Sequence, residues 1–313
     1  PPRKRFWLYA PYGLVLVIVI GWAAFWFMVK GRVAEGLDQW IVREATAGRD
    51  WRCQDRSIAG FPFRLEVKCA SLSLARPSDA FAPAITMGPL LVVAQIYDPS
   101  HLIAEPKGPA TATWADGRKA SLAWETGQLS LRRSSGQFER GSLVLAQPVL
   151  TLAGFESGEG TSRAARMEIH LRPTPARAAE AALDIALSFD KLVMPALDQL
   201  FSSADPADLK IEATLSQSSG FAGGFTPTTL ETWRVAGGVL EFSRLGLAKG
   251  MAQMEGQAKL SLDEFRRIRG RLDGAQTGID TLAGIRIGAM LDAGALLSGR
   301  PAAQAQGGRS LKP

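Results

Sequence analysis

The strongest pattern in the chain is an uninterrupted apolar segment near the N-terminus. Residues 8–29 form a run of 22 positions without a charged side chain, bounded by basic residues on both sides. An α-helix rises about 1.5 Å per residue, so it crosses the roughly 30 Å hydrocarbon layer of a membrane in about 20 residues. Aromatic side chains that suit the headgroup level stand near both ends of the run: Trp7, Tyr9, Tyr12, Trp22 and Trp26. The pattern predicts a membrane-spanning helix.

A cleaved secretory signal is the alternative to a retained anchor. Such a signal has an apolar stretch of about 7 to 15 residues and a cleavage site made of small residues. The run here is longer, and residues 25–29 continue it beyond the small pair Ala23 and Ala24. Cleavage at that pair would leave an apolar new terminus, so we expect the anchor to be retained.

A helical period follows the anchor between residues 33 and 48. Val33, Leu37, Trp40 and Ile41 recur at spacings of three and four, while charged residues take the other faces. The spacing predicts a short amphipathic helix that ends near Gly48. This helix can either lie on the membrane or cap the domain that follows, and capping is the simpler interpretation.

From residue 49 onward the hydrophobic period changes from helical to alternating. Phe61, Phe63, Leu65, Val67 and Cys69 are separated by polar residues or proline, which is typical of a half-buried strand. The alternation returns in segments 122–126, 129–131, 143–145, 167–171, 183–189, 209–215, 240–247 and 258–262. Glycine and serine turns separate the segments at intervals that suit hairpins. The chain is therefore predicted to be mainly β, with a mostly antiparallel sheet.

Four parts follow from these patterns. Residues 1–32 form the basic N-terminus and the anchor, residues 33–48 the juxtamembrane helix, residues 49–298 a β-rich domain and residues 299–313 a disordered tail. Helices interrupt the β-rich domain at 193–201, 228–235 and 279–297 in this prediction.

The charges beside the anchor predict its orientation and explain the basic composition. Arg3, Lys4 and Arg5 precede the run, whereas Lys30 and Arg32 follow it together with nearby acidic residues. The positive-inside rule then places the N-terminus in the cytoplasm and the main domain on the other side. The chain has a net charge of +6 and a pI near 9.6. Because these flanking residues supply most of the excess, the β-rich domain is almost neutral and no nucleic-acid partner is expected.

The two cysteines fit an exported domain. Cys53 and Cys69 are the only cysteines of the chain, and a lone pair beyond a membrane is expected to form a disulfide. Two unrelated buried thiols are an alternative. A metal pair is disfavoured because there is no CxxC motif and because His101 and His170 are isolated.

No pattern in the chain indicates catalysis. There is no GxSxG elbow, HExxH helix, P-loop or GxGxxG turn. Asp98 and His101 could in principle form a general base with its orienting group, but no serine is specified beside them. We therefore expect no enzyme activity, no catalytic residues, no metal and no cofactor.

One group of basic residues stands late in the β-rich domain. Alternation places Arg267, Arg269 and Arg271 on one face of a strand, opposite Ile268 and Leu272. These arginines can contact lipid headgroups at a membrane surface. Solvated arginines on an outer face are the more common arrangement.

Two segments resemble known families. Trp51 and Cys53, followed by the run GFPFRLEVxC at 60–69, resemble a proteobacterial envelope family known as domain of unknown function 2125. Residues 238–272 more weakly resemble the closing segment of AsmA-like periplasmic proteins. That second resemblance implies that the single N-terminal transmembrane helix is followed by an elongated, curved, mostly antiparallel sheet, whose apolar inner face serves to move or shelter lipids.

Two functions follow as hypotheses for a single-pass protein of the bacterial inner membrane with a periplasmic main domain. In the first, the protein binds or transfers a membrane lipid, and Phe61, Phe63, Leu65, Val67 and Trp124 face its acyl chains. In the second, it is an assembly or scaffold protein that binds another envelope protein through strand edges. A continuous apolar surface inside the sheet favours lipid, whereas an interdigitated core favours a scaffold.

Overall fold

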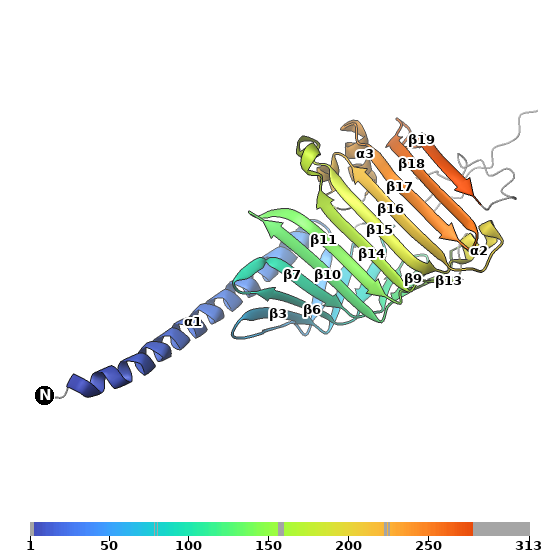
Figure 1. Cartoon of the computed structure of the whole chain (residues 1–313). Helices are drawn as coiled ribbons and strands as arrows, with labels where there is room; N and C mark the ends of the chain where they lie inside the picture. The colour runs from blue at the N-terminus through green and yellow to red at the C-terminus, as the bar shows by residue number, and fades with distance from the viewer. Residues whose placement is uncertain are drawn as a thin grey trace, which may run out of the picture. The chain divides into compact units, whose positions relative to one another are not determined.

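A computed structural model of the chain describes residues 3–77, 79, 81–155, 160–221, 224 and 226–277. The chain divides into two compact units. The first contains the residues up to Leu171 together with Ser188–Ala207, and the second contains Arg172–Leu187 and the chain from Asp208 onward. Most described residues lie in antiparallel strands, and the sheets are open rather than closed into a barrel (Figure 1). The predicted fold class is confirmed.

The N-terminal segment forms one long helix, α1 (Arg3–Thr46), which is drawn in blue in Figure 1. It includes both the predicted anchor and the predicted juxtamembrane helix without a break. By length and composition the part Tyr9–Thr46 could cross a membrane. The helix ends two residues before Gly48, whose positive φ of 78° suits glycine and turns the chain toward the first strand.

Two sheets make up most of the first unit. The smaller sheet has the strand order β1 (Asp50–Gln54), β4 (Ser71–Ala75), β5 (Ala84–Met87), β8 (Ala110–Thr113), β9 (Lys119–Ala123), β12 (Val149–Ala153) and β13 (Gly160–Arg163). The larger sheet contributes, in this unit, the order β2 (Ser57–Ala59), β3 (Arg64–Cys69), β6 (Leu90–Gln95), β7 (Asp98–Pro106), β10 (Thr126–Ser134), β11 (Gln137–Ala146) and β14 (Arg166–Pro173). Strands at the same place in the two orders follow one another directly along the chain, as β1 and β2 do.

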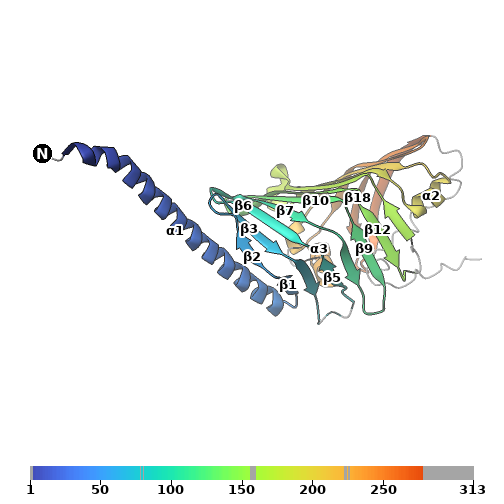
Figure 2. The same cartoon turned by 90° about the horizontal axis from the view of Figure 1, so that it is seen from below.

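Each strand of the smaller sheet continues into its counterpart in the larger sheet after one to three residues. β3 and β4, for example, are separated only by Ala70, and β9 and β10 only by Trp124 and Glu125. The two sheets are therefore the two halves of seven long strands that all bend at the same level. Figure 2 shows β3, β6, β7 and β10 on one side of this bend and β1, β5, β9 and β12 on the other.

Backbone hydrogen bonds continue through the bend. The Ala70 amide donates to the Gln54 carbonyl at 2.8 Å, the Lys107 amide to Pro89 at 2.8 Å, and the Glu125 amide to Ala146 at 3.0 Å. Prolines and residues with positive φ, such as Pro89 and Gln147, stand in the bend because such residues interrupt a regular ladder. The bend is thus a continuous seam rather than a row of loose loops.

The second unit contains a short helix and further antiparallel strands. Its strands include β16 (Ala207–Leu215), β17 (Leu240–Lys249), β18 (Ala252–Leu262) and β19 (Ile268–Thr277), and β15 (Leu183–Leu192) begins in it. Helix α3 (Pro227–Val235) is capped by Thr226 and Thr229, and its buried Trp233 donates to the Ser216 carbonyl at 2.7 Å. Two short 3-10 helices, η1 (Pro175–Glu180) and η2 (Ser218–Phe221), complete the unit.

The predicted helices at 193–201 and 228–235 correspond to α2 (Pro195–Phe201), which lies in the first unit, and to α3. The predicted helix at 279–297 and the predicted tail at 299–313 lie outside the described residues.

One predicted strand begins later than expected. Phe61 and Phe63 alternate with Leu65 in the sequence, but β3 begins only at Arg64, and residues 61–63 form a turn. Gly60 has a φ of 104°, and the Arg64 amide donates back to its carbonyl at 3.2 Å. Pro62 has no N–H to give to a ladder, so the alternation at this point reflects a turn and not a strand.

Candidate functional site

In the smaller sheet of the first unit, one face is apolar on every strand except β13, which places Gly160 and Ser162 there. Directly paired residues of an antiparallel ladder lie on the same face, so the register traces this face from strand to strand. Its members are Trp51, Cys53, Leu72, Leu74, Ile85, Met87, Ala110, Ala112, Ala120, Leu122, Leu150 and Leu152. The strands β1, β4, β5, β8, β9 and β12 all contribute.

The other half of each bent strand repeats this arrangement. In the larger sheet the apolar face carries Ile58, Leu65, Val67, Cys69, Leu90, Val92, Ala94, Leu102, Ala104, Leu129, Leu131, Leu143, Leu145, Met167, Ile169 and Leu171. Each half of the folded sheet therefore has one continuous apolar face.

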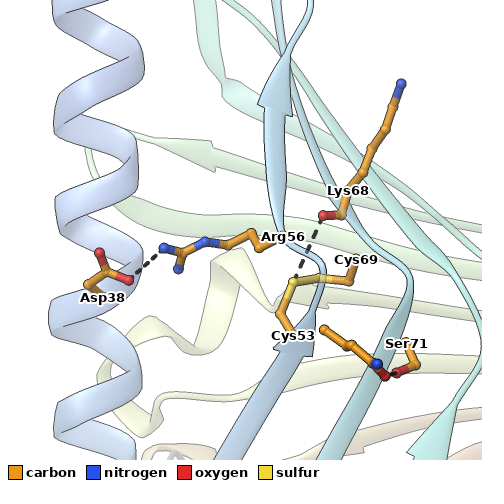
Figure 3. Close-up of a disulfide and its surroundings, with 7 residues drawn as sticks. Asp38, Cys53, Arg56, Lys68, Cys69 and Ser71 are labelled. Carbon is orange, nitrogen blue, oxygen red and sulfur yellow. Dashed lines mark hydrogen bonds and ion pairs between the residues drawn. A yellow bond between two sulfur atoms is a disulfide. The ribbon is translucent and has the colours of Figure 1, made fainter.

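The disulfide shows that both apolar faces lie on the inside of the bend. Cys53 belongs to the first face and Cys69 to the second, and their bond holds the two Cα atoms 5.2 Å apart (Figure 3). Cys53 pairs with Leu72, which is three residues beyond Cys69 and would lie about 10 Å from it in a straight strand. Only folding toward the side that carries both cysteines brings them this close. We call the two apolar faces together the inner face.

The inner face is only partly buried. Leu65, Leu74, Ala104 and Leu145 are buried, but most of the other members remain half-exposed. Ile85 keeps 37% of its surface exposed and Leu129 keeps 42%. In the part of the chain that the structure describes, the inner face is thus an apolar surface that is not sealed as an ordinary core would be.

Trp124 lies at the corner of the bend. Its indole N–H donates to the Pro106 carbonyl at 2.9 Å. A side chain on Gly127 would come within 2.6 Å of the Trp124 Nε1 and within 3.1 Å of Leu145, so the glycine leaves room for both groups. The half-buried Trp124 ring therefore stands on the inner side, beside Leu145.

The other side is polar in the smaller sheet and mixed in the larger sheet, where Leu91, Val93 and Ile103 also lie on it. In the smaller sheet, paired positions across the strands carry Ser73, Thr86, Thr111, Ser121, Thr151 and Thr161. In the larger sheet, β3 carries Arg64, Glu66 and Lys68, and both basic groups pair with Glu66 at 2.6 and 2.9 Å. The hydrogen bond from Lys68 holds the pKa of Glu66 below its ordinary value, and the charge of Arg64 contributes in the same direction.

Of the sequence-predicted lipid-facing residues, Leu65, Val67 and Trp124 lie on the inner face or in its corner, as just described. Phe61 and Phe63 do not. They stand in the turn between β2 and β3, with 52% and 63% of their surfaces exposed, and this turn packs against α1. Sequence reasoning missed this contact, although two indole N–H groups inside an apolar helix, at Trp22 and Trp26, are a signal that a partner must exist.

The C-terminal half of α1 is fixed to the first bent strand. The Asp38 carboxylate pairs with Arg56 at 2.7 Å, as Figure 3 shows, and the rings of Trp40 and Trp51 are 5.7 Å apart. Near the end of the helix the Glu44 carboxylate accepts from the Trp51 indole at 3.3 Å. In this way α1 lies along β1 and β2, the edge strands of the two sheets (Figure 2).

The predicted headgroup arginines lie in the second unit. Arg267 precedes β19, and its guanidinium pairs with Asp263 at 2.7 Å. Arg269 and Arg271 pair in register with Ser261 and Lys259, on the charged face of that sheet, and Arg271 also contacts Asp273. The opposite face carries Leu240, Phe242, Leu260 and Leu272.

The histidines and acidic groups of the described residues form no recognisable catalytic arrangement. The Asp98 carboxylate accepts from Ser100, which lowers the pKa of Asp98, while His101 contacts Ser130 at 3.0 Å. His170 contacts Glu168 at 3.0 Å on the outer side of β14. No cluster of three or more histidine, cysteine or acidic side chains suited to a metal occurs among the residues described.

Comparison with known proteins places the chain among bacterial sequences of one family. A family model described as "Uncharacterized protein conserved in bacteria (DUF2125)" matches residues 26–312, which include the disulfide, the bent strands and the second unit. No curated protein and no solved structure matches the chain.

Proposed function

We propose that this chain, which belongs to the DUF2125 family of uncharacterised bacterial proteins, is a non-enzymatic, membrane-anchored lipid-binding protein. In this proposal a membrane lipid places its acyl chains along the inner face of the first unit, and the protein shelters or transfers it within the cell envelope. The family was predicted from the segment around Cys53 and Cys69. The resemblance to AsmA-like proteins stays a prediction, as do the inner-membrane location and the periplasmic side.

The observation that supports the proposal best is the state of the inner face. Seven bent strands direct apolar side chains to the same side, yet most of these side chains keep contact with solvent. A large exposed apolar surface is costly in water and usually marks a binding site. Covering it with an acyl chain gains about 0.8 kcal/mol for each CH₂ group that leaves water.

The rest of the molecule is compatible with such a ligand. The anchor holds the domain beside a source of lipid, and α1 runs along the edge of the folded sheet. The outer side carries hydroxyl groups across the smaller sheet and paired charges on β3, so it is more polar than the inner face. An elongated apolar surface with few charges suits acyl chains better than a soluble polar substrate.

Photo-crosslinking in membranes tests the proposal. The full-length protein would carry p-benzoylphenylalanine at Leu122 or Leu150 on the inner face, or at the adjacent outer positions Ser121 or Thr151 as matched controls. After irradiation of cells labelled with radioactive phosphate, we expect phospholipid adducts at Leu122 and Leu150 and none at the controls. Absence of lipid at both inner positions would overturn the proposal.

The same experiment distinguishes the alternative function. An assembly or scaffold protein would give adducts with the mass of a second protein rather than of a lipid. Adducts of that kind at the inner positions, recovered in fixed proportion to the chain, would favour the assembly function over lipid binding.

A further inference from the structure

We propose that residues 61–63, here called the aromatic turn, insert into the same bilayer that α1 spans. The domain would then contact the membrane at a second point besides its anchor. This inference does not depend on lipid binding by the inner face, because it concerns a different surface of the first unit.

The aromatic turn packs directly on the apolar part of α1. The Phe63 ring lies 6.2 Å from Trp22, and the Phe61 ring lies 5.5 Å from Trp26 in an edge-to-face arrangement. Phe61 also stacks on Phe27 at 6.4 Å. Trp22 and Trp26 are one helical turn apart, so they present one face of the helix to the turn.

The level of these contacts along α1 places the aromatic turn at membrane depth. Trp22 lies seven residues before Val29, the last residue of the charge-free run. At a rise of about 1.5 Å per residue this is about 10 Å inside the end of the apolar segment, and Trp26 is about 5 Å inside it. If residues 8–29 span the bilayer, the side chains that contact Trp22 and Trp26 lie between the headgroups and the outer part of the hydrocarbon layer.

Four carbonyl groups in and beside the turn accept hydrogen bonds from the protein. The Trp22 indole donates to the Pro62 carbonyl at 2.9 Å, and the Trp26 indole donates to the Arg64 carbonyl at 3.1 Å. The Gly60 carbonyl accepts from Arg64, and the Phe63 carbonyl accepts from Ile96 at 3.1 Å. These bonds lower the cost of placing irregular backbone at the membrane interface, and Pro62 has no N–H that needs a partner.

The exposed surface around the turn is aromatic. Phe61 and Phe63 keep 52% and 63% of their surfaces exposed, and the adjoining Phe27 keeps 62%. Tyr97, next to the Ile96 that bonds Phe63, keeps 70%. An aromatic patch of this kind is costly in water but suits the membrane interface, where one end of a ring is apolar and the other is wet.

Basic side chains mark the boundary of the patch. The Lys30 ammonium lies 5.7 Å from the centroid of the Trp26 ring, at the end of the apolar run. Arg64 follows the aromatic turn at once, and its side chain is 62% exposed. Such long side chains extend their charges to headgroup phosphates while their stems stay beside apolar groups. The occupant that fits this surface is therefore the bilayer and not a protein partner.

Depth-dependent quenching tests the inference. Because Cys53 and Cys69 are joined, an added cysteine can be labelled selectively. The full-length variants Phe61→Cys and Phe63→Cys, carrying a polarity-sensitive nitrobenzoxadiazole label, would be reconstituted in phosphatidylcholine and phosphatidylglycerol vesicles. Asp116→Cys, in the turn between β8 and β9, is the matched control.

We expect labels at 61 and 63 to emit at shorter wavelength than the control label, to lose quenching by aqueous iodide, and to be quenched by lipids with a doxyl group near the headgroup. Iodide quenching equal to that at residue 116 would overturn the inference. A second variant, with p-benzoylphenylalanine in place of Phe61, keeps an aromatic side chain there and should give phospholipid adducts. Adducts confined to α1 would contradict insertion, whatever the outcome at Leu150.

Discussion

In the smaller sheet, the inner and outer sides carry opposite kinds of residue on the same strands. Leu150 and Thr151 are neighbours on β12, yet Leu150 pairs with Leu122 on the inner face, whereas Thr151 pairs with Ser121 on the outer side. The outer row of serine and threonine continues across the smaller sheet. Threonine favours strands without adding a large apolar surface, so polar rows are compatible with every strand of this sheet.

The difference between the hydroxyl-rich outer side and the apolar inner face indicates why the inner face is exposed. A chain that places hydroxyl groups at alternate positions of each strand could also have reduced the apolar exposure of Ile85 and Leu129, which remain 37% and 42% exposed. The inner face instead stays apolar through both halves of the bend. Its exposure is therefore better explained as a surface kept for an apolar ligand than as a poorly filled core.

The largest expected difference between the two sides concerns stability. Leu145 on the inner face is 2% exposed, and it lies beside Gly127 and Trp124. The substitution Leu145→Ala should lower the free energy of unfolding by about 2–5 kcal/mol, because it removes buried methyl groups and leaves a cavity. Urea unfolding of the full-length protein in detergent micelles, followed by tryptophan fluorescence, measures this loss.

The adjacent outer residue provides the control for that measurement. Val144 is on the opposite side of β11 and only half-buried, so Val144→Ala should cost clearly less. Equal losses for the two variants would mean that the two sides do not differ in burial as described.

The disulfide gives the next largest effect. Cys53 and Cys69 are 16 residues apart in the sequence and join the two halves of the inner face. Replacing both with serine should lower the free energy of unfolding by about 3 kcal/mol in the chain-entropy model. The comparison is made by urea unfolding of the double variant and of the oxidised and reduced forms of the unaltered protein. If oxidised and reduced protein unfold at the same urea concentration, the bond does not stabilise the bend.

Local patterns were sufficient to predict the long apolar helix, the class of fold and the disulfide. A charge-free run of 22 residues and an alternation such as that of Leu65, Val67 and Cys69 are visible in short windows of sequence. The bends were not predicted, because all of them except the one between β7 and β8 shift the alternation by one residue. Between β3 and β4, for example, the inner positions Cys69 and Leu72 are three residues apart rather than two, and such a break in the alternation looks like the end of a strand. That these breaks align in space depends on long-range pairing.

The candidate site was predicted only in part for the same reason. Leu65 and Val67 follow the strand period, and their inner position could be expected from it. Phe61 and Phe63 share that period, but Gly60 and Pro62 turn the chain before the strand begins. Their contact with Trp22 and Trp26 joins segments about 40 residues apart in the sequence, and no local pattern specifies such a contact.

A smaller effect is expected from pH on the outer side. The hydrogen bond from Lys68 and the charge of Arg64 lower the pKa of Glu66 in the folded protein below its ordinary value of 4.5. This pairing therefore stabilises the fold above that value, and the contribution is lost as the pH falls through the lowered pKa. It should not exceed about 1 kcal/mol, because both basic side chains are more than half exposed.

The variant Glu66→Gln isolates this contribution. Its free energy of unfolding should fall less steeply than that of the unaltered protein between neutral pH and pH values below 4.5. Parallel curves for the two proteins would show that Glu66 gains nothing from Lys68 and Arg64.

The smallest effect on stability is expected at Thr151, the outer neighbour of the inner residue Leu150. Thr151 is exposed on the outer side, so Thr151→Glu should change the free energy of unfolding by no more than about 0.5 kcal/mol. It should also leave the yield of lipid adduct from a photo-crosslinker at Leu122 unchanged.

Leu150→Glu places the same carboxylate one residue away, beside Leu122 on the inner face. An acyl chain there would have to lie against an ionised group or force it to take up a proton, and both are costly. The yield of adduct should therefore fall for Leu150→Glu alone, and equal yields in the two variants would show that the inner face does not hold the lipid.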